Sequence, residues 1–279
     1  MNERQKEQQH VNETIALIHR EQAILSQQKQ ELAAKMDDQL KEIADKKIRG
    51  GDSEAFYESV IEYQQHEQEL LIKYQTAESQ EKRVKTLTTM AGNPYFARID
   101  FKEEQETETL YLGIASLRDK DEETIVIDWR APIANLYYEG ELGETFYETD
   151  TDRFTVELLL KRQFKIQNGE ILSMVDTSEI INDEFLLEIL DEASSSQMRN
   201  IVSTIQKAQN QIIRDTTNKF LLIEGIAGSG KTSALLQRVA FLLYRNRKWL
   251  DEKQVLLFSP NHLFSDYISM VLPLSLIHI

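Results

Sequence analysis

One stretch of this sequence has the residue types and the spacing needed to bind a nucleotide. Residues 225–232 read Gly-Ile-Ala-Gly-Ser-Gly-Lys-Thr, which fits the phosphate-binding-loop pattern G-x-x-x-x-G-K-[ST] at every fixed position. Glycines let several backbone N–H groups approach a phosphate, and a helix that begins at the end of the loop presents further unpaired N–H groups to the anion. We therefore predict that this loop binds a nucleoside triphosphate.

Each polar group of the loop has a predicted role. Lys231 would reach the β- and γ-phosphates, and the Thr232 hydroxyl would be a ligand of Mg²⁺. These two residues are the candidate catalytic residues. The other predicted nucleotide-binding residues of the loop are Gly225, Ala227, Gly228, Ser229, Gly230 and Ser233.

The neighbouring residues decide whether the pattern is a real phosphate-binding loop or an ordinary turn from a strand to a helix. An apolar run at 220–223 predicts a buried parallel strand before the loop, and the apolar spacing over 233–244 predicts a helix after it. A second strand is predicted at 254–258 and a further helix at 263–272. This βαβ order is typical of the start of a RecA-like domain.

The N-terminal part has a helical composition. No glycine or proline occurs at 2–47, and an apolar seam with steps of four and three runs from Val11 to Ile43, although some of its positions are polar. A second seam runs from Phe56 to Thr88 after Gly50-Gly51, and includes Tyr63 and Tyr74. We predict an antiparallel coiled-coil finger that folds near Gly50 and places Leu25 opposite Tyr74. The alternatives are a dimerisation coiled coil or a solvated helical pair.

The middle part has strand patterns. Residues 96–101, 109–114 and 124–129 are rich in β-formers, 118–123 reads as a charged hairpin loop, and Asn168-Gly169 is a strong hairpin signal. Gly140 and Gly143 indicate another turn, between the strand-like runs 136–138 and 145–147. We predict a small antiparallel sheet or barrel of about six to eight strands. At Asp128-Trp129-Arg130 we expect a packed tryptophan with a surface ion pair.

Composition limits the class of protein. The 279 residues include no cysteine, which excludes disulfides and thiolate metal sites, and the net charge is −15. The charge is concentrated at 93–182, where 20 acidic and 9 basic residues leave a net charge of −11. A protein that grips nucleic acid by itself usually carries a basic stripe, so this balance disfavours that class. The polar N-terminus and the lack of a long apolar run predict a cytoplasmic protein without a membrane partner.

Several longer strings resemble a known family. Residues 209–213, Gln-Asn-Gln-Ile-Ile, resemble the adenine-reading Q motif of UvrD/Rep-like superfamily 1 helicases, with 225–232 as motif I and 258–261 as motif Ia. The strings NPYFARIDF, YLGIASL, DWRAPIANLYY and TIQKAQNQIIR, preceded by a helical finger, resemble the HelD-type ATPases that associate with bacterial RNA polymerase. The resemblance covers residues 1 to about 273.

This resemblance implies a function and several contacts. It implies a helicase-like motor that uses ATP and Mg²⁺, binds bacterial RNA polymerase through the finger and releases the polymerase from nucleic acid. Gln209 would read the adenine, and the finger tip at 47–54 would bring Asp52 and Glu54 near the polymerase active site. The motor domain would contact DNA or RNA through Ser259, Pro260 and Asn261. The oligomeric state stays open.

The predicted organisation is multidomain, with α+β and α/β parts. Residues 1–92 form the finger, 93–182 the β-rich domain, and 183–279 the first part of a RecA-like ATP-binding domain. Since no motif after motif Ia follows, we expect an N-terminal fragment of a larger ATPase that binds nucleotide without necessarily hydrolysing it. Two other functions stay open: a conventional 3′→5′ DNA helicase, and a nucleotide-gated scaffold without turnover.

Overall fold

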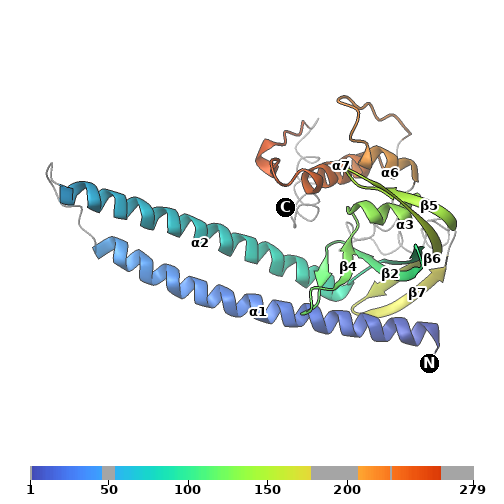
Figure 1. The fold of residues 1–279 in the computed structure, drawn as a ribbon, viewed down its shortest axis with the longest axis horizontal. Coiled ribbons are helices and arrows are strands. Elements are labelled where there is room, and N and C mark those ends of the chain that lie inside the picture. Colours follow the sequence, from blue (N-terminus) through green and yellow to red (C-terminus); the bar gives the residue numbers. More distant parts are fainter. Residues whose placement is uncertain (1, 46–53, 177–206, 227, 259–279) are drawn as a thin grey trace. The chain divides into compact units, whose positions relative to one another are not determined.

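The computed structural model of the protein describes residues 2–45, 54–176, 207–226 and 228–258. The chain divides into two compact units. The sheet unit consists of Met1–Ala16 and Thr89–Ile279, and the hairpin unit consists of Leu17–Thr88. Figure 1 gives the element labels used below.

The helices and strands occur in the order that follows. The first part contains α1 (Glu3–Asp45), α2 (Glu54–Gly92), β1 (Ala97–Glu103), β2 (Glu106–Gly113), β3 (Leu117–Arg118) and β4 (Thr124–Asp128). The second part contains the 3₁₀ helix η1 (Pro132–Ala134), α3 (Asn135–Tyr138), β5 (Gly143–Glu148), β6 (Arg153–Gln167), β7 (Glu170–Asp176), α6 (Lys207–Arg214), α7 (Lys231–Arg245) and the 3₁₀ helix η2 (Glu252–Gln254).

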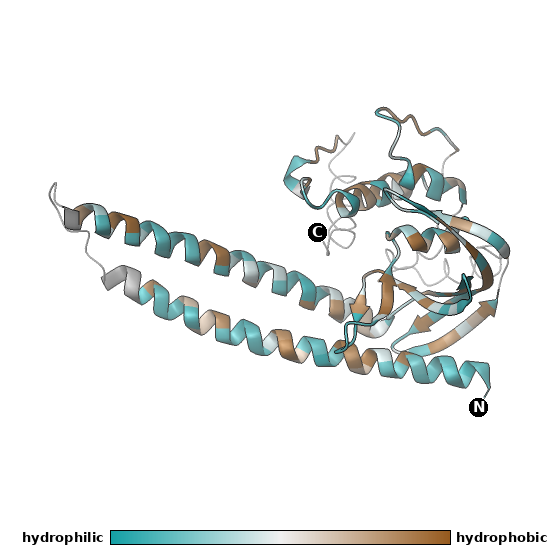
Figure 2. Ribbon diagram, viewed as in Figure 1, coloured by the Kyte–Doolittle hydropathy of each residue, from teal (hydrophilic) through white to brown (hydrophobic). Residues whose placement is uncertain are grey.

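Two long antiparallel helices make up the hairpin unit, as the sequence predicts. The absence of glycine and proline inside α1 lets one helix run for 43 residues, and α2 runs for 39. Figure 2 shows that both helices carry long polar stretches with apolar residues between them. Ile18 and Leu87 are fully buried, whereas much of the remaining contact surface between the helices is polar.

The predicted seam positions on α1 from Val11 to Gln39 are at least partly buried except Lys29, whereas half of the predicted positions on α2 are wrong. Along α2, the positions that are at least partly buried at 66, 70, 73, 77, 80, 84 and 87 replace the predicted 67, 70, 74, 77, 81, 84 and 88. Tyr74 is 51% exposed, while the neighbouring Lys73 donates a hydrogen bond to Gln39 on α1. Long polar side chains fill these seam positions because they can bond across the helices, and tyrosine can keep its polar end in water.

The pairing of the two helices also differs from the prediction. Gln22 Nε2 donates to Thr88 Oγ1 at 3.0 Å, and Lys29 Nζ lies 3.4 Å from Glu81 Oε2. Residues near Leu25 therefore face residues near 85 rather than Tyr74, a shift of about eleven residues. A seam with several polar positions does not define a unique register, so the assumed fold at Gly50 misplaced the pairs.

Thiol cross-linking in this cysteine-free protein tests the register. The double variant Gln22→Cys/Thr88→Cys is expected to be joined by a short bismaleimide in high yield, since the native side chains are within hydrogen-bond distance. The matched pair Leu25→Cys/Tyr74→Cys should remain unjoined under the same conditions. Proteolysis followed by peptide mapping identifies the linked segments. Efficient joining of Leu25→Cys/Tyr74→Cys alone would support the register predicted from the sequence instead.

The sheet unit contains a mixed seven-stranded sheet. The strand order is β3-β4-β2-β1-β6-β5, and β7 pairs with β6. All adjacent pairs are antiparallel except β2 and β4, which are parallel, with Tyr111 opposite Val126. The sequence predicted a fully antiparallel sheet. The short β3 explains the difference, because it carries the chain past the position of β4 before the hairpin at 119–123 returns it alongside β2.

Two local predictions in this unit have opposite outcomes. The Asn168-Gly169 hairpin is confirmed between β6 and β7, with φ of 51° and 81° at these two residues, as a primed turn requires. The segment Leu136–Tyr138 is helical rather than extended. Pro132 begins the helical turns there because its φ is already fixed near the helical value, and all three apolar residues of α3 are buried in the core.

Candidate nucleotide-binding site

Helix α7 begins immediately after the glycine loop. Its first residue is Lys231, and the preceding Gly230 is left-handed with φ of 76°. Gly228 has φ of 83°, and a side chain added there would meet nothing within 4 Å. Both glycines therefore adopt a conformation that other residues rarely adopt. The helix is held by buried residues on one face, among them Leu236, Ala240 and Phe241.

Lys231 folds back over its own loop. Its Nζ donates to the carbonyl of Gly225 at 2.8 Å and to that of Ile226 at 2.6 Å. Gly225 approaches Ser229 so closely that an added Cβ would lie 2.7 Å from the Ser229 hydroxyl. The ammonium group thus lies within the loop, where a phosphate oxygen could replace a carbonyl as its acceptor.

Gln209 lies beside the same loop. From α6, its Nε2 donates to the carbonyl of Ser229 at 3.3 Å, and a Cβ added to Gly230 would lie 2.6 Å from that nitrogen. The sequence separates Gln209 from the loop by about twenty residues, and the fold brings them together. A glycine suits position 230 because of its φ of 76°, whereas the Gln209 amide lies at the end of a flexible side chain that could shift away from an added Cβ.

The remaining loop residues take the following places. Thr232 and Ser233 lie in the first turn of α7, half-buried, and no side chain caps this helix N-terminus. Ala227 lies outside the described residues. The open N-terminus, the two left-handed glycines and the lysine fit a bound triphosphate. Among the described residues no group of three or more acidic, histidine or cysteine side chains could hold a metal.

The predicted strand before the loop is not observed as a strand. Residues 220–226 have no regular structure, and Phe220 is 94% and Leu222 83% exposed. The predicted strand at 254–258 is likewise absent, with Phe258 88% exposed. An apolar run forms a buried parallel strand only where neighbouring strands supply hydrogen bonds, and the described residues supply none here. The predicted helix at 263–272 lies outside the described residues.

The sequence reading missed the contacts made by the other face of α6. Asn210 donates to Asn135 Oδ1 and Glu139 Oε1, both at 2.7 Å, and Arg214 donates to the carbonyl of Trp129 at 2.6 Å. The expected surface ion pair of Asp128 and Arg130 is wrong. Both side chains are buried, and Arg130 Nη2 lies 2.6 Å from Asp128 Oδ2.

The proton affinities in this region follow from burial. Loss of water contact lowers the pKa of Arg214 to about 10, although the charges of Glu139 and Asp128 oppose this shift. Burial also raises the pKa of the Tyr244 hydroxyl on α7. At neutral pH the arginine therefore remains a cation and the tyrosine remains neutral.

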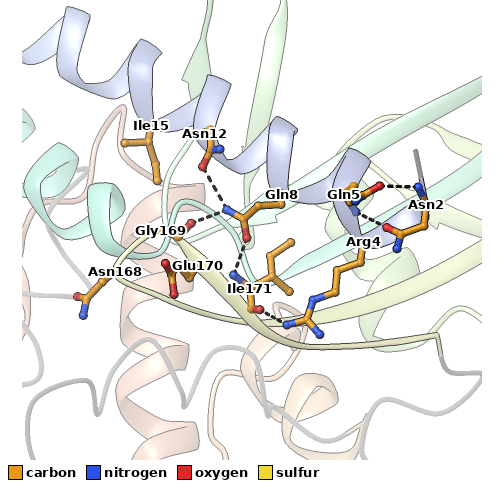
Figure 3. A pocket seen from close by; sticks show the side chains of 10 residues that line it. All are labelled: Asn2, Arg4, Gln5, Gln8, Asn12, Ile15, Asn168, Gly169, Glu170 and Ile171. Carbon is orange, nitrogen blue, oxygen red and sulfur yellow. Dashed lines mark hydrogen bonds between the residues drawn. The ribbon is translucent and has the colours of Figure 1, made fainter.

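A hollow also lies between the start of α1 and the β6–β7 turn (Figure 3). Its volume is about 660 Å³. Gln8 crosses it, donating to the carbonyl of Gly169 at 2.7 Å and accepting from the N–H of Ile171 at 2.9 Å, and Arg4 donates to the carbonyl of Ile171 at 2.6 Å. Through these bonds Arg4 and Gln8 fasten the start of α1 to the β6–β7 turn.

Residues 4–188 match the family described as "DNA helicase IV HelD, N-terminal domain". The match covers well over half of the sequence. The chain belongs to the HelD family. It contains the family's N-terminal region, in which two long helices precede a mixed sheet, and the loop at 225–232 lies beyond the matched residues. A comparison with curated proteins finds no match.

Most of the residues predicted to contact partners lie outside the residues that the structure describes. Asp52, Ser259, Pro260 and Asn261 lie outside the described residues, and Glu54 is the first residue of α2. Among the described residues, no helix is both long enough and apolar enough to cross a membrane.

Proposed function

We propose that the intact protein is an ATP-dependent, helicase-like motor of the HelD family whose nucleotide site is the loop at 225–233. The observation that carries this proposal is the arrangement of left-handed glycines, Lys231 and the uncapped start of α7, with Gln209 beside them. This arrangement supports binding of ATP with Mg²⁺, in which Lys231 contacts the phosphates and Gln209 the base.

We also propose a three-part organisation for this chain. Residues 1–92 would act as a coiled-coil finger, 93–182 as a β-rich domain, and 183–279 as part of a UvrD-like, RecA-type motor domain. The two helices of the hairpin unit and the mixed sheet support the first two parts. The glycine loop followed by α7 supports the third, and a RecA-type sheet would bury the exposed apolar residues at 220–223.

We propose bacterial RNA polymerase as the partner of the hairpin unit, in the cytoplasm. The resemblance to HelD-type ATPases supports this partner, and the finger tip with Asp52 and Glu54 would be the part that approaches the polymerase active site. The hairpin unit suits a protein partner because large apolar side chains such as Tyr57, Ile61 and Ile72 are exposed along it. ATP-linked motion would then release the polymerase from nucleic acid.

A conventional 3′→5′ DNA helicase is the second candidate function. The family description itself contains the words "DNA helicase", which favours this candidate. Such an enzyme would contact single-stranded DNA through Ser259, Pro260 and Asn261, and its DNA affinity would fall steeply with salt. The net charge of −15 favours the polymerase instead.

Co-purification separates the two candidates. The intact protein is expected to co-purify with RNA polymerase, and replacement of residues 17–88 by a short Gly-Ser linker is expected to abolish that association. The same deletion should leave binding of a fluorescent ATP analogue within about twofold of the original, because the loop and α6 belong to the sheet unit. Processive unwinding of duplex DNA by a protein that does not bind polymerase would instead establish the conventional helicase.

A further inference from the structure

Arg214 fastens the C-terminal end of α6 to a turn of the sheet unit. The turn consists of residues 129–131, directly after β4. Arg214 Nη2 donates to the carbonyl of Trp129 at 2.6 Å, and Nη1 lies 3.3 Å from the carbonyl of Ala131 and 3.4 Å from that of Arg130. A planar guanidinium can bond several fixed acceptors at once, whereas a lysine ammonium cannot reproduce that fork.

The turn that receives Arg214 is itself held rigidly. Asp128 Oδ1 accepts from the backbone N–H and from Nε of Arg130, both at 2.8 Å, and the N–H of Ala131 donates to the carbonyl of Asp128 at 3.0 Å. This buried pair fixes the directions of the carbonyls that bind Arg214. The Arg130 guanidinium also lies 4.7 Å from the ring centroid of Tyr244 on α7.

Further contacts of α6 reinforce the same attachment. Arg214 Nε donates to Asn210 Oδ1 at 3.0 Å, and the Asn210 amide group in turn donates to Asn135 and Glu139 around α3. The Arg214 guanidinium also lies 5.2 Å from the ring centroid of Phe241 on α7. One face of α6 is therefore fixed at both of its turns.

Gln209 projects from a different face of the same helix. Adjacent residues on an α-helix point about 100° apart, so Gln209 and Asn210 project in different directions. Asn210 bonds the region of α3, and Gln209 reaches the carbonyl of Ser229 in the glycine loop at 3.3 Å. With eight residues, α6 is short enough that fixing its far end also fixes the position of Gln209.

The acceptors of Arg214 are groups whose directions are fixed by the surrounding chain. Each oxygen that accepts a hydrogen bond from it in the described structure is uncharged: three backbone carbonyls and one amide. Burying a cation against neutral acceptors costs free energy, which an apolar residue at this position would avoid. The arginine does, however, set the position of α6 through directional bonds.

We propose that Arg214 is a positioning residue for nucleotide binding, which anchors α6 to the turn at 129–131 and thereby holds Gln209 at the phosphate-binding loop. This inference rests on the proposed function of the loop. It adds that the sheet unit's β-rich part takes part in forming the nucleotide site, because it holds α6.

Arg214→Lys, made in the intact protein, is the central variant, because it retains the charge and most of the volume while losing the fork. Its affinity for a fluorescent ATP analogue is expected to fall about tenfold, since small displacements of a positioning group have effects of this size. Amide hydrogen exchange at 207–214 should become faster in the nucleotide-free protein. Arg245→Ala is the matched control. It removes an exposed ion pair between Arg245 on α7 and Asp150, and should leave both the ATP-analogue affinity and the hydrogen exchange at 207–214 unchanged.

A double-variant comparison separates positioning from general destabilisation. If Arg214 acts through Gln209, then Arg214→Lys in a Gln209→Ala background should lower affinity by less than about twofold further, because there is no longer an amide to position. A similar loss in both backgrounds, or unchanged affinity in Arg214→Lys, would overturn the inference. Arg214→Gln provides a second variant should the lysine variant fold poorly.

The failure of the proposed function would look different from the failure of this inference. If the unsubstituted protein does not bind the ATP analogue, and Lys231→Ala behaves identically, the assignment of the loop is wrong. If the unsubstituted protein binds and Lys231→Ala does not, the loop assignment stands. The Arg214 variants then decide the positioning role alone.

Discussion

Replacing Lys231 by alanine is expected to lower the affinity of the intact protein for ATP and Mg²⁺ by about 10- to 100-fold. A hydrogen bond to a charged group contributes roughly 1.5–3 kcal/mol, and each 1.4 kcal/mol corresponds to a factor of ten in affinity. The Lys231 ammonium lies 2.8 Å and 2.6 Å from two carbonyl oxygens of the loop. A charged phosphate oxygen would displace these neutral acceptors. Isothermal titration or a fluorescent analogue measures the loss, and turnover should fall with it.

The same substitution should hardly change folding. Gly225 and Ile226, whose carbonyls Lys231 binds, are exposed to water, so loss of these bonds should cost less than about 1 kcal/mol of the free energy of unfolding. Lys248→Ala is the matched control, because Lys248 is an exposed lysine just after α7 and should leave ATP affinity unchanged. Unaltered affinity in Lys231→Ala, in a protein that binds ATP, would remove the loop from the site.

Local patterns predicted the elements of the fold better than their partners. The glycine-free run in α1 and the Asn168-Gly169 turn each depend on a few adjacent residues, and both are confirmed. The parallel pairing of β2 with β4 depends on the path of the intervening chain, which no local pattern records. The aromatic residues at 136–138 favour a strand, whereas Pro132 starts a helical turn there.

The candidate site divides in the same way. The loop at 225–232 has a pattern specific enough to be found in the sequence, and the Gln209 prediction came from a family resemblance. Arg214 and Asn210 carry no such pattern, because their partners at Trp129 and Asn135 lie more than seventy residues away in the chain. Charged residues are seldom buried, so the sequence favours a surface position for Asp128 and Arg130. Their spacing in the chain does not show that the two side chains pair with each other inside the protein.

The second large effect is expected at Glu7, near the start of α1. Its side chain is 1% exposed and accepts hydrogen bonds from Arg98 at 2.6 Å, from Arg162 at 2.7 Å and from the Tyr111 hydroxyl at 3.0 Å. Arg98 and Arg162 project from β1 and β6, so this one carboxylate fixes the first turns of α1 to two neighbouring strands. Figure 1 shows this end of α1 beside the sheet.

Removing Glu7 leaves two partly buried cations that face each other without the anion between them. Breaking a buried pair by deleting one partner commonly costs 3–5 kcal/mol. The arginines retain Asp100 and Asp176 as partners, so we expect the lower end, about 3 kcal/mol for Glu7→Ala, or a fall in melting temperature of about 6–12 °C. Glu7→Gln keeps the shape but not the charge, and should lose at least half as much.

Comparison with an exposed ion pair makes this expectation specific. Glu122→Ala removes the partner of Arg118, and their side chains are 79% and 61% exposed, so stability should change by no more than about 0.5 kcal/mol. Thermal unfolding followed by circular dichroism measures both variants, and hydrogen exchange at 3–16 should rise in Glu7→Ala alone. Equal melting temperatures for the two variants would contradict a structural role of this network.

The pH dependence of the network has a definite sign. The hydrogen bond from Arg162 holds the pKa of Asp176 below its ordinary value. A lowered pKa in the folded state means that this pair contributes stability above the ordinary carboxyl pKa and loses it as pH falls through the lowered value. The same Arg162 guanidinium also binds Glu7 on α1 at 2.7 Å, and Asp176 helps to hold that guanidinium in place. Acid should therefore loosen the start of α1 in the unsubstituted protein. In Glu7→Ala the carboxylate that binds Arg98 and Arg162 is already absent. Acidification should therefore raise hydrogen exchange at 3–16 by less in this variant than in the unsubstituted protein.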